Sequence, residues 1–529
     1  MPVSRPLLTL ALLLLAALAC SRTAPQSDPG GGPVSHVTVV GGGEALPVTP
    51  HTSTPNSPIV SGQVYPTKEV VGTPTPDATR PSPRSDSPQG YIVQPGDTLG
   101  SIAERYSVTV AEIMTANNLQ SDVLSVGQQL TIPAASLAPA PDYKIIPDSE
   151  LVYSPSVIGF DVEAVVNRFG GYLASYVETD RDGVTRTGAQ TVQVVAERYS
   201  VNPRLLLALL EHMSGWVTIK FPPEDTLIYP FGHFEPGKEG LLRQLSWAAD
   251  ELNAGYYGWR ENKLAALPFN DGGTLAVAPS VNAGTVALQY FFTNHFAGGD
   301  WMRQVQPGGF DLTYSTLFGN PFAYAFEPLM PTGLAQPALD WPFEKQEVWY
   351  FTGGPHGGWD SGSAWAALDF APDTEGCQIA EQWVVAAADG LIARSGEGAV
   401  LQDLDGDGFE QTGWTLFYMH IGATDRVSSG TFLRKGDRVG HPSCEGGFSN
   451  GTHLHFARKY NGEWVAADGA IPFNLAGWTM ISAWREYDGW LRNGDTQLEA
   501  QDLDLALEAG AARRAGERSA VHDLDGDAA

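Results

Sequence analysis

Histidines gather in one part of this sequence. The chain has 529 residues and 11 histidines, and five of the histidines lie between positions 356 and 455. Neutral imidazole is a common zinc ligand, so the cluster is a candidate metal site. The sequence contains no His-Glu-x-x-His helix, so that type of zinc site is not indicated. The candidate side chains fall in three segments: 350–372, 414–420 and 451–456.

The spacing within two of these segments favours a shared face. His453 and His455 are two residues apart on a predicted strand, so both point to the same side. The segment 416–420 alternates in the same way and can present His420 beside them. For any one histidine alone, an ordinary surface residue is the simpler explanation. The joint pattern instead predicts an N/N/O zinc triad with an open fourth position, which leaves other histidines to carry protons.

The three segments closely resemble the lysostaphin and β-lytic group of zinc endopeptidases. The resemblance covers about 350–475. It includes Gly-Asp-Arg-Val-Gly at 436–440 and Val-Val-Ala-Ala-Ala-Asp-Gly at 384–390, both typical of that barrel-like β fold.

The resemblance assigns a role to each candidate. It implies that His356, Asp369 and His455 bind zinc. It also implies that His453 is the general base for the zinc-bound water, and that His420 steadies the oxyanion or holds the water. Zinc lowers the pKa of such a water to about 7 and polarises the scissile carbonyl.

Two aspartates compete for the place of the acidic ligand. Asp360 follows His356 at the short spacing that is common in the wider family. Asp369 lies in Leu-Asp-Phe-Ala-Pro, the context of the metal ligand, and its separation from His356 (369 − 356 = 13) matches the longer form of the β-lytic subgroup. We therefore predict that Asp369 is the ligand and that Asp360 is a loop residue.

A second metal candidate is weaker. Asp403, Asp405 and Asp407 have the spacing that begins a calcium loop. An EF-hand needs Glu at position twelve of its loop, and that position here is Trp414. A turn between strands is the simpler interpretation, and a Ca²⁺ loop of another type stays open.

The three cysteines have different settings. Cys20 ends an apolar run, 7–19, that follows Arg5, and this pattern resembles a bacterial lipoprotein signal in which the cysteine is lipidated. Ordinary cleavage nearby is the alternative, and either interpretation exports the protein. In an oxidising compartment Cys377 and Cys444 are most simply a disulfide. Free thiols or a metal site are the other options, although the two lack the CxxC spacing of zinc sites.

Residues 91–133 are typical of a compact strand–helix–helix–strand unit. Asp97 is predicted to cap the first helix. The unit resembles the LysM module through Tyr-x-Val-x-x-Gly-Asp-Thr-Leu at its start and Val-Gly-Gln-x-Leu-x-Ile-Pro at its end. The resemblance implies binding of N-acetylglucosamine polymers, chiefly peptidoglycan. The loops expected to form the glycan groove contain Gly96, Asp97, Thr98, Leu99 and Asn118.

The segment from 151 to 335 has helix-period apolar positions. Residues 201–216 resemble the catalytic helix of lysozyme-like transglycosylases and glucosaminidases. Those families carry Glu-Ser-Gly where this chain has Met213-Ser-Gly, and Glu211 lies about 200° around the helix from that place. We expect a degenerate domain that is inactive as a glycosidase and could bind glycan. Cleavage through Glu211 is the alternative. The predicted helices are 161–172, 191–199, 203–213, 239–257 and 285–294.

Composition completes the domain plan. Segments rich in Pro, Gly, Ser, Thr or Ala cannot bury enough apolar surface to fold, so they predict a tether and a linker. The fold class is multidomain α+β, with a mostly helical middle domain and a C-terminal antiparallel β peptidase domain. The predicted order is signal peptide 1–20, disordered tether 21–90, LysM 91–134, linker 135–150, lysozyme-like helical domain 151–335, zinc peptidase domain 336–490 and acidic disordered tail 491–529.

The net charge of the chain excludes one class of function. The formal net charge of −29 argues against a nucleic-acid binder, which needs a basic face. The sequence predicts a lipid-anchored cell-wall hydrolase at the cell envelope, a zinc endopeptidase that cleaves peptide cross-links of peptidoglycan while LysM holds the glycan. The alternative is a non-catalytic peptidoglycan-binding regulator of another hydrolase.

Overall fold

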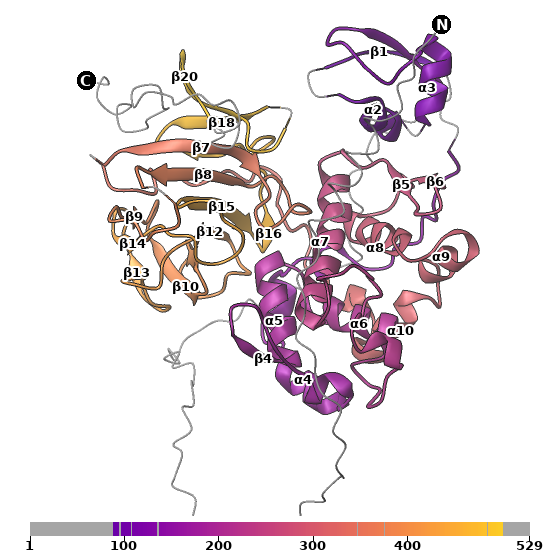
Figure 1. Ribbon diagram of the computed structural model, residues 1–529, viewed down its shortest axis with the longest axis horizontal. Helices are drawn as coiled ribbons and strands as arrows, with labels where there is room; N and C mark the ends of the chain where they lie inside the picture. Colours follow the sequence, from indigo (N-terminus) through magenta and orange to yellow (C-terminus); the bar gives the residue numbers. More distant parts are fainter. Residues whose placement is uncertain are drawn as a thin grey trace, which may run out of the picture. The chain divides into compact units, whose positions relative to one another are not determined.

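The computed structural model describes residues 88–500, apart from positions 95, 96, 107, 135, 136, 346, 375 and 484 (Figure 1). The predicted signal with Cys20, most of the predicted tether, Gly96 and the last 29 residues lie outside the described part. No helix within the described part is long and apolar enough to span a membrane.

The first folded unit has the predicted strand–helix–helix–strand order. Its two strands pair antiparallel and enclose a small core of its own, in which Ile102, Ile113 and Ile132 are fully buried. A reciprocal capping box between Thr109 and Glu112 starts its second helix. The elements are β1 (Gln89–Ile92), α2 (Leu99–Tyr106), α3 (Val110–Asn117) and β2 (Gln129–Ile132).

The second unit is helical and is built around α6. Every residue from 205 to 210 is fully buried, because neighbouring helices cover all sides of this apolar helix. Asn202 caps α6 and Pro203 begins it, as the sequence predicted. The helices are α4 (Val162–Phe169), α5 (Gly188–Tyr199), α6 (Pro203–Ser214), α7 (Leu241–Arg260), α8 (Ala283–Thr293), α9 (Gly298–Gln304) and α10 (Phe310–Phe318). Two hairpins join them, β3 (Val177–Thr179) with β4 (Thr185–Thr187) and β5 (Ala266–Pro268) with β6 (Thr274–Ala276).

Part of the segment predicted as a linker at 135–150 is packed into the helical unit. Ile145 and Ile146 are almost fully buried. Asp148 accepts hydrogen bonds from the Asn282 side chain and the Gly284 backbone at the start of α8. The linker prediction was wrong here, because the few apolar residues of this Pro-rich stretch pack against α8, which lies far along the chain.

The third unit is antiparallel β (Figure 1). Its main sheet has the strand order β13-β10-β11-β12-β15-β8-β7, with β16 paired to β15. The strands are β7 (Trp349–His356), β8 (Ala367–Pro372), β9 (Val384–Val385), β10 (Gly390–Gly396), β11 (Ala399–Asp403), β12 (Trp414–Met419), β13 (Phe432–Leu433), β14 (Arg438–Gly440), β15 (Leu454–Tyr460), β16 (Glu463–Trp464), β17 (Asn474–Leu475), β18 (Trp478–Ser482), β19 (Gly489–Asn493) and β20 (Thr496–Glu499).

The chain stays folded beyond the predicted start of the tail at position 491. Strands β19 and β20 pair with each other and belong to a four-stranded sheet with β17 and β18. Leu491 is fully buried in the core of the β unit. We predicted this boundary too early in the chain, because β20 is short and polar and its composition resembles that of the acidic residues that follow it.

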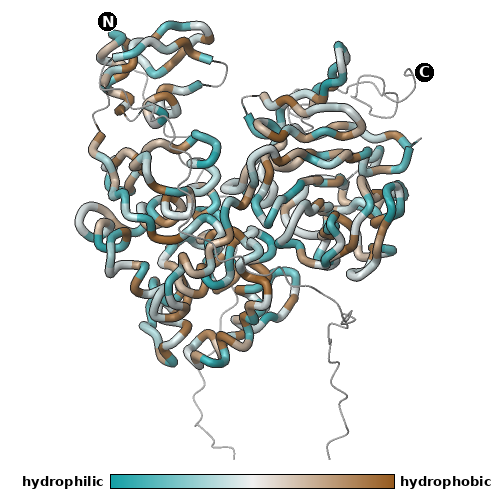
Figure 2. Tube along the Cα trace, turned by 180° about the vertical axis from the view of Figure 1, so that it is seen from behind, coloured by the Kyte–Doolittle hydropathy of each residue, from teal (hydrophilic) through white to brown (hydrophobic). Residues whose placement is uncertain are grey.

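Strand alternation gives the main sheet two different faces. On β12 and β15, Tyr418 and Phe456 point into the core of the β unit. Their neighbours Phe417, Met419 and Ala457 belong to a second buried cluster that they share with the helices. Figure 2 shows hydrophobic and hydrophilic positions mixed along much of the chain. Both faces of these strands are thus covered, which explains their nearly continuous apolar sequence.

Close helix packing predicts the effect of one substitution. A Cβ on Gly255 of α7 would lie 2.8 Å from the Cα of Ala287 on α8. Gly255→Ala should therefore lower the melting temperature, since overpacking costs about 1–3 kcal/mol and exceeds the gain in helix propensity of roughly 1 kcal/mol. Gly299→Ala is the control, because on α9 its Cβ meets only the flexible end of Arg303, and it should raise stability slightly. Equal melting temperatures for the two variants would contradict the prediction.

Candidate functional site

Three strands bring the predicted metal ligands together. His356 ends β7, Asp369 lies in the middle of β8, and His455 is the second residue of β15. Strands β8 and β15 pair in a register that places His455 directly opposite Asp369. All three residues are buried.

The ligand atoms form a small triangle. His356 Nε2 lies 2.9 Å from His455 Nδ1, and Asp369 Oδ1 lies 3.3 Å from each of these nitrogens. A tetrahedral zinc ion with bonds of about 2.0–2.2 Å keeps its ligand atoms roughly 3.3–3.6 Å apart. The triangle therefore has the size that zinc requires, slightly contracted along its shortest side.

One atom of the triangle tests the fit of a cation. Asp369 Oδ1 is buried and has no hydrogen-bond partner in the described part of the chain. Its close nitrogen neighbours lie at ion-pair distance but not in hydrogen-bonding geometry. A buried carboxylate oxygen without a donor is costly, whereas a shared cation would satisfy it. The donor set, two imidazoles and one carboxylate, fits a zinc ion.

Backbone carbonyls orient the two imidazoles. His356 Nδ1 lies 2.8 Å from the carbonyl oxygen of Gly354, and His455 Nε2 lies 3.1 Å from that of Gly358. In the neutral tautomer whose proton lies on the nitrogen near the carbonyl, the other nitrogen turns a lone pair toward the triangle. This is the usual outer arrangement of a metal-bound histidine.

Burial and charge work against each other in the triangle. Burial alone would raise the pKa of Asp369, but the charges of His356 and His453 outweigh it and hold that pKa well below its ordinary value. Burial alone would lower the pKa of His356, but the Asp369 carboxylate outweighs it and raises the pKa. The site thus stabilises an ionised carboxylate next to positive charge, as a metal centre does.

Two more histidines lie beside the triangle. The rings of His420 and His453 have centroids 4.4 Å apart, and His453 Nε2 lies 3.7 Å from Asp369 Oδ1. His453 Nδ1 is bonded to the Gly451 carbonyl at 2.8 Å, and His420 Nδ1 to the Glu445 carbonyl at 3.0 Å. Each ring therefore keeps its Nε2 free of these carbonyl bonds, and His420 lies beside His453, as the alternation in 416–420 predicted.

His420 has an unusual backbone and an unusual pKa. Its φ of 63° lies in the left-handed region, which non-glycine residues seldom adopt outside functional or turn positions. Burial, reinforced by the charges of His453 and His455, lowers its pKa to about 3. His420 is therefore neutral at neutral pH.

Sequence reasoning missed one aromatic neighbour of the site. The ring of Tyr487 stacks on His356 with centroids 4.2 Å apart and an interplanar angle of 19°. Tyr487 lies between β18 and β19, more than a hundred residues along the chain from His356. Its positive φ of 64° is a feature of the fold, and no local motif marks it in the sequence.

The predicted disulfide is confirmed. Cys377 and Cys444 are bonded, with Cα atoms 5.4 Å apart. The neighbour of Cys444, Glu445, holds His420 through its carbonyl. The neighbour of Cys377, Gly376, accepts hydrogen bonds from Thr452, which precedes His453. The disulfide therefore links the two segments that orient the additional histidines.

Asp360, the rejected acidic ligand, faces the helical unit. It accepts a hydrogen bond from the hydroxyl of Tyr199 at 2.9 Å. Nearby, Asp250 of α7 accepts from the Gly362 backbone at 2.7 Å and from the Ser361 hydroxyl at 3.0 Å. The loop 357–363, which supplies the carbonyl partner of His455, is thus held by α5 and α7.

The predicted glycan residues of the first unit have mixed placements. Leu99 is 2% exposed and belongs to the core, so its side chain is not available to a glycan. Thr98, not Asp97, caps α2, because its Oγ1 accepts from the Ser101 backbone at 3.0 Å. Asp97 instead accepts from the Tyr91 hydroxyl and the Gln94 backbone. Asn118 ends α3 in the left-handed conformation.

The carboxylate of Glu211 already accepts hydrogen bonds within the helical unit. It accepts from the backbones of Val217 and Thr218, both at 3.0 Å, and from the Thr218 hydroxyl at 2.5 Å. This is the arrangement of a structural acceptor, and a general acid needs the opposite, a proton to donate. The structure therefore gives no support to glycosidic cleavage through Glu211.

The acidic cluster of Asp403, Asp405 and Asp407 forms between β11 and β12. Asp403 accepts hydrogen bonds from the backbones of Asp405, Gly406 and Gly408. Burial is the main cause that raises the pKa of Asp403 to about 7, and the hydrogen bond and charge of the neighbouring Asp405 raise it further. These contacts are those of a tight turn, and the geometry supports no more than an acidic cluster.

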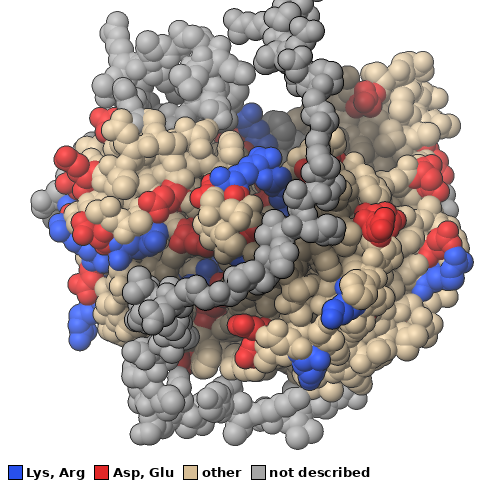
Figure 3. Space-filling model, turned by 60° about the horizontal axis from the view of Figure 1, so that its bottom comes forward, with Lys and Arg blue, Asp and Glu red and all other residues tan. Residues whose placement is uncertain are grey.

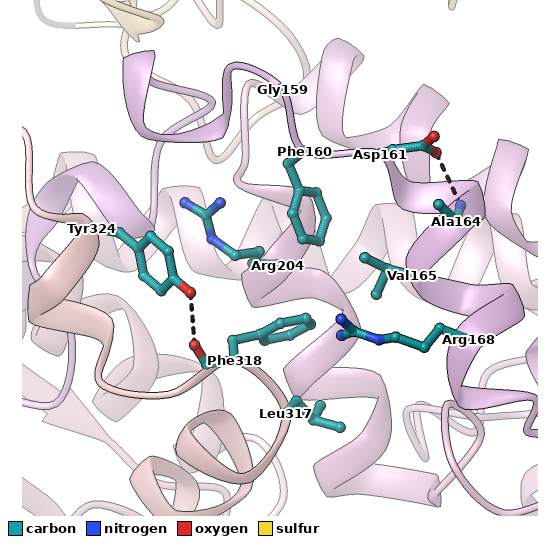
Figure 4. Close-up of a pocket in the computed structure, with 10 residues that line it drawn as sticks. All are labelled: Gly159, Phe160, Asp161, Ala164, Val165, Arg168, Arg204, Leu317, Phe318 and Tyr324. Carbon is teal, nitrogen blue, oxygen red and sulfur yellow. Dashed lines mark hydrogen bonds between the residues drawn. The ribbon is translucent and has the colours of Figure 1, made fainter. Parts of the chain in front are cut away.

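A cavity of about 450 Å³ opens in the helical unit (Figure 4). Its buried polar group is Arg204, which pairs with Glu150 through two hydrogen bonds of 3.1 and 2.6 Å. The guanidinium lies 4.2 Å from the centre of the Tyr324 ring, whose hydroxyl donates to the Phe318 carbonyl. Arg204 is thus fully engaged in joining α6 to the segment before it, which is a structural role.

Comparisons with known proteins match two parts of the chain to families. Residues 91–133 match the LysM domain family, and residues 144–331 match the family described as LasA, N-terminal domain. The chain is 26% identical to Protease LasA of Pseudomonas aeruginosa over 359 residues, covering 65% of this chain and 78% of that protein. It is also 34% identical over 120 residues to the N-acetylmuramoyl-L-alanine amidase XlyA of Bacillus subtilis, covering 22% and 40%.

Two solved structures of peptidases match part of this chain at low TM-scores. The M23 metalloprotease pseudoalterin matches with 23% identity over 31% of this chain and 96% of its own, with a TM-score of 0.26. The catalytic domain of lysostaphin from Staphylococcus simulans matches with 22% identity over 23% and 89%, with a TM-score of 0.17. Taken together, the comparisons confirm the resemblance found in the sequence, a lysostaphin-type peptidoglycan peptidase with a LysM domain. The match of the helical unit to the LasA family was not anticipated from the sequence.

The ligand triangle predicts which substitutions should lower the affinity for zinc. His455→Ala and Asp369→Asn should each lower zinc affinity at least about 100-fold, more than the loss of an outer-shell partner. His441→Ala is the control, because that ring lies against Trp383 and is bonded to the Gln382 carbonyl. Zinc per chain, measured by elemental analysis after dialysis, should be near one for wild type and control. Full zinc content in the His455 variant would refute the ligand set.

The raised pKa of the Asp250 carboxyl group predicts that the stability of the protein depends on pH. Burial, followed by the charge of Asp360, raises its pKa to about 7, so the folded state binds a proton there that the unfolded state releases near pH 4. Wild-type stability should therefore fall between about pH 4 and pH 7 relative to Asp250→Asn, which cannot titrate. The difference in melting temperature between the two proteins, recorded at pH 4.5 and 7.5, measures this. A difference that does not change with pH would contradict it.

Proposed function

We propose that this protein is an exported, zinc-dependent endopeptidase that cleaves peptide cross-links of peptidoglycan. The observation that carries the proposal is the buried Asp369 Oδ1, which has no hydrogen-bond partner among the described residues and lies 3.3 Å from a ring nitrogen of His356 and of His455. The relation to Protease LasA supports the peptidase class, and the LysM match supports peptidoglycan as the polymer that is held.

In this proposal His356, Asp369 and His455 hold the zinc ion. When bound there, zinc polarises the scissile carbonyl and makes a water molecule nucleophilic near neutral pH. His453 takes the proton of that water through Nε2, since its Nδ1 is engaged with the Gly451 carbonyl. The same ring then returns the proton to the leaving amine.

The tautomer of His420 decides between its two proposed roles. Its Nδ1 donates to the Glu445 carbonyl, and its low pKa leaves Nε2 without a proton. Such a nitrogen accepts a hydrogen bond, so it suits an O–H of the attacking water and not an oxyanion. We therefore assign His420 to holding the water, where it helps to fix the direction of attack.

The LysM unit is proposed to hold glycan through Thr98, Asn118 and the backbone of the loops around them. Hydrogen bonding is the appropriate mode, because the whole chain carries a net charge of −29. In Figure 3 Lys and Arg side chains are interspersed with Asp and Glu on the face that is shown. Bulk attraction to an anionic wall is therefore not the source of affinity.

Export and anchoring complete the proposal. The Cys377–Cys444 disulfide suits an oxidising, extracytoplasmic compartment. We propose that the N-terminal segment directs export and that lipidated Cys20 anchors the chain at the cell envelope.

The test separates binding from catalysis. Purified wild type should release peptide fragments from cell walls, and mass spectrometry of the fragments should show peptide cuts only. His453→Ala should keep one zinc per chain and lose at least about 100-fold in rate, the lower range for general base catalysis. His441→Ala, outside the site, should cleave normally.

Three results would reject the proposal. They are cleavage that survives zinc removal, full activity of the His453 variant, or glycan cuts alone. A wild type that binds walls without any cleavage would instead favour the non-catalytic regulator.

A further inference from the structure

The helical unit contains a second cavity, of about 370 Å³, away from the metal triangle. It lies where α7, the β5–β6 turn and the end of α8 meet, and Figure 1 shows these elements close together. Its volume is in the range of small-molecule sites. The lining residues are Gly232, His233, Phe234, Trp247, Glu251, Asn270, Asn294 and His295.

Aromatic rings form one side of this cavity. His233 stacks on Trp247 with centroids 4.3 Å apart and an interplanar angle of 8°, and His295 meets Trp247 edge-on at 5.3 Å. Phe234 is 72% exposed although it is large and apolar. The cavity thus has a rigid aromatic wall and an exposed ring beside it.

Hydrogen-bonding groups form the other side. The Nε2 atom of His295 is buried and has no partner in the described part of the chain. Glu251 accepts from Asn294 at 2.9 Å, and Asn270 donates to the Asn294 carbonyl at 2.6 Å. Asn270 and Asn294 each keep a side-chain amide oxygen in addition to these donors. The amide oxygens of Asn270 and Asn294 are acceptors for which the hydroxyl groups of a ligand could supply donors.

We propose that this cavity binds an uncharged sugar unit, such as an N-acetylhexosamine of a glycan chain. Sugar hydroxyls and the acetamido group both donate and accept, which matches a wall of carboxylate, amide and imidazole groups. The apolar C–H face of a sugar suits the exposed ring of Phe234. The site is separate from the LysM unit, and the proposal does not depend on peptidase activity.

Other ligand classes fit less well. An anion would meet the carboxylate of Glu251. The groups of three metal-binding side chains found in the described residues lie elsewhere, in the β unit. An ammonium ion binds best inside a cage of several open aromatic faces. His233 covers one face of Trp247, and the exposed ring of Phe234 alone does not form such a cage.

The distribution of tryptophan makes the proposal testable in the full chain. The LysM segment 91–133 contains no tryptophan, so glycan binding there has no indole of its own to report it. Titration with tri-N-acetylglucosamine should change tryptophan fluorescence saturably in wild type. Trp247→Phe should abolish the change. Trp383→Phe is the matched control, because Trp383 also packs on a histidine, His441, but lies in the β unit, and it should keep the change.

Affinity variants address the polar wall. Glu251→Gln and the exposed Asn270→Ala should each weaken the fluorescence-detected binding at least tenfold, while their melting temperatures show that they fold. No saturable change in wild type would overturn the proposal, as would a full change in Trp247→Phe. Unaltered affinity in both polar variants would also overturn it, as would displacement of the sugar by methylammonium, which would indicate a cation site. Cleavage of cell walls, measured in parallel in Trp247→Phe and in Trp383→Phe, reports on the metal site, so a failure of the sugar site and a failure of the metal site can be told apart.

Discussion

The register of β15 between β8 and β12 is the constraint on which the site depends. It places His455 opposite Asp369 on one side and opposite Met419, the neighbour of His420, on the other. A slip of one residue would turn His455 into the core of the β unit and bring Phe456 to the site. The same pairing therefore buries the core and assembles the metal triangle, so the two cannot change independently.

The face that carries His455 is also the face that the helical unit covers. Buried charges span this contact: Lys459 and Arg394 both pair with Glu410, and Arg394 lies 3.7 Å from Glu197 of α5. Arg394 and Lys459 help to hold the pKa of Glu410 near 2 against the opposing effect of its burial. Breaking one member of such a network leaves a buried charge without compensation. The helical unit is therefore an integral part of the structure around the site, and through α5 and α7 it holds the loop 357–363 in place.

How far the sequence predicted the site follows from how local each feature is. His453 and His455 share a strand face because of a two-residue spacing, and the Leu-Asp-Phe-Ala-Pro context marks Asp369 without any knowledge of the fold. Sequence analysis did not identify Tyr487, because its contact with His356 joins segments that are distant in the sequence. The capping role of Thr98 and the buried position of Leu99 depended on where α2 begins, to within one residue, and composition does not resolve that. The linker boundary failed for a related reason, because Ile145 and Ile146 are buried by partners far along the chain.

The sequence by itself predicted the residues of the triangle and the LysM unit through motifs that resemble known families. It predicted the disulfide because two cysteines remain besides Cys20, and the helical character of the middle segment through its periodicity. Only the tertiary structure decided that Asp369 Oδ1 faces two imidazole nitrogens, that Glu211 is a structural acceptor, and that His295 has a buried nitrogen without a partner among the described residues. These properties depend on which donors and acceptors reach one another in space. Strand register and helix packing set those distances, and no single segment of the chain contains them.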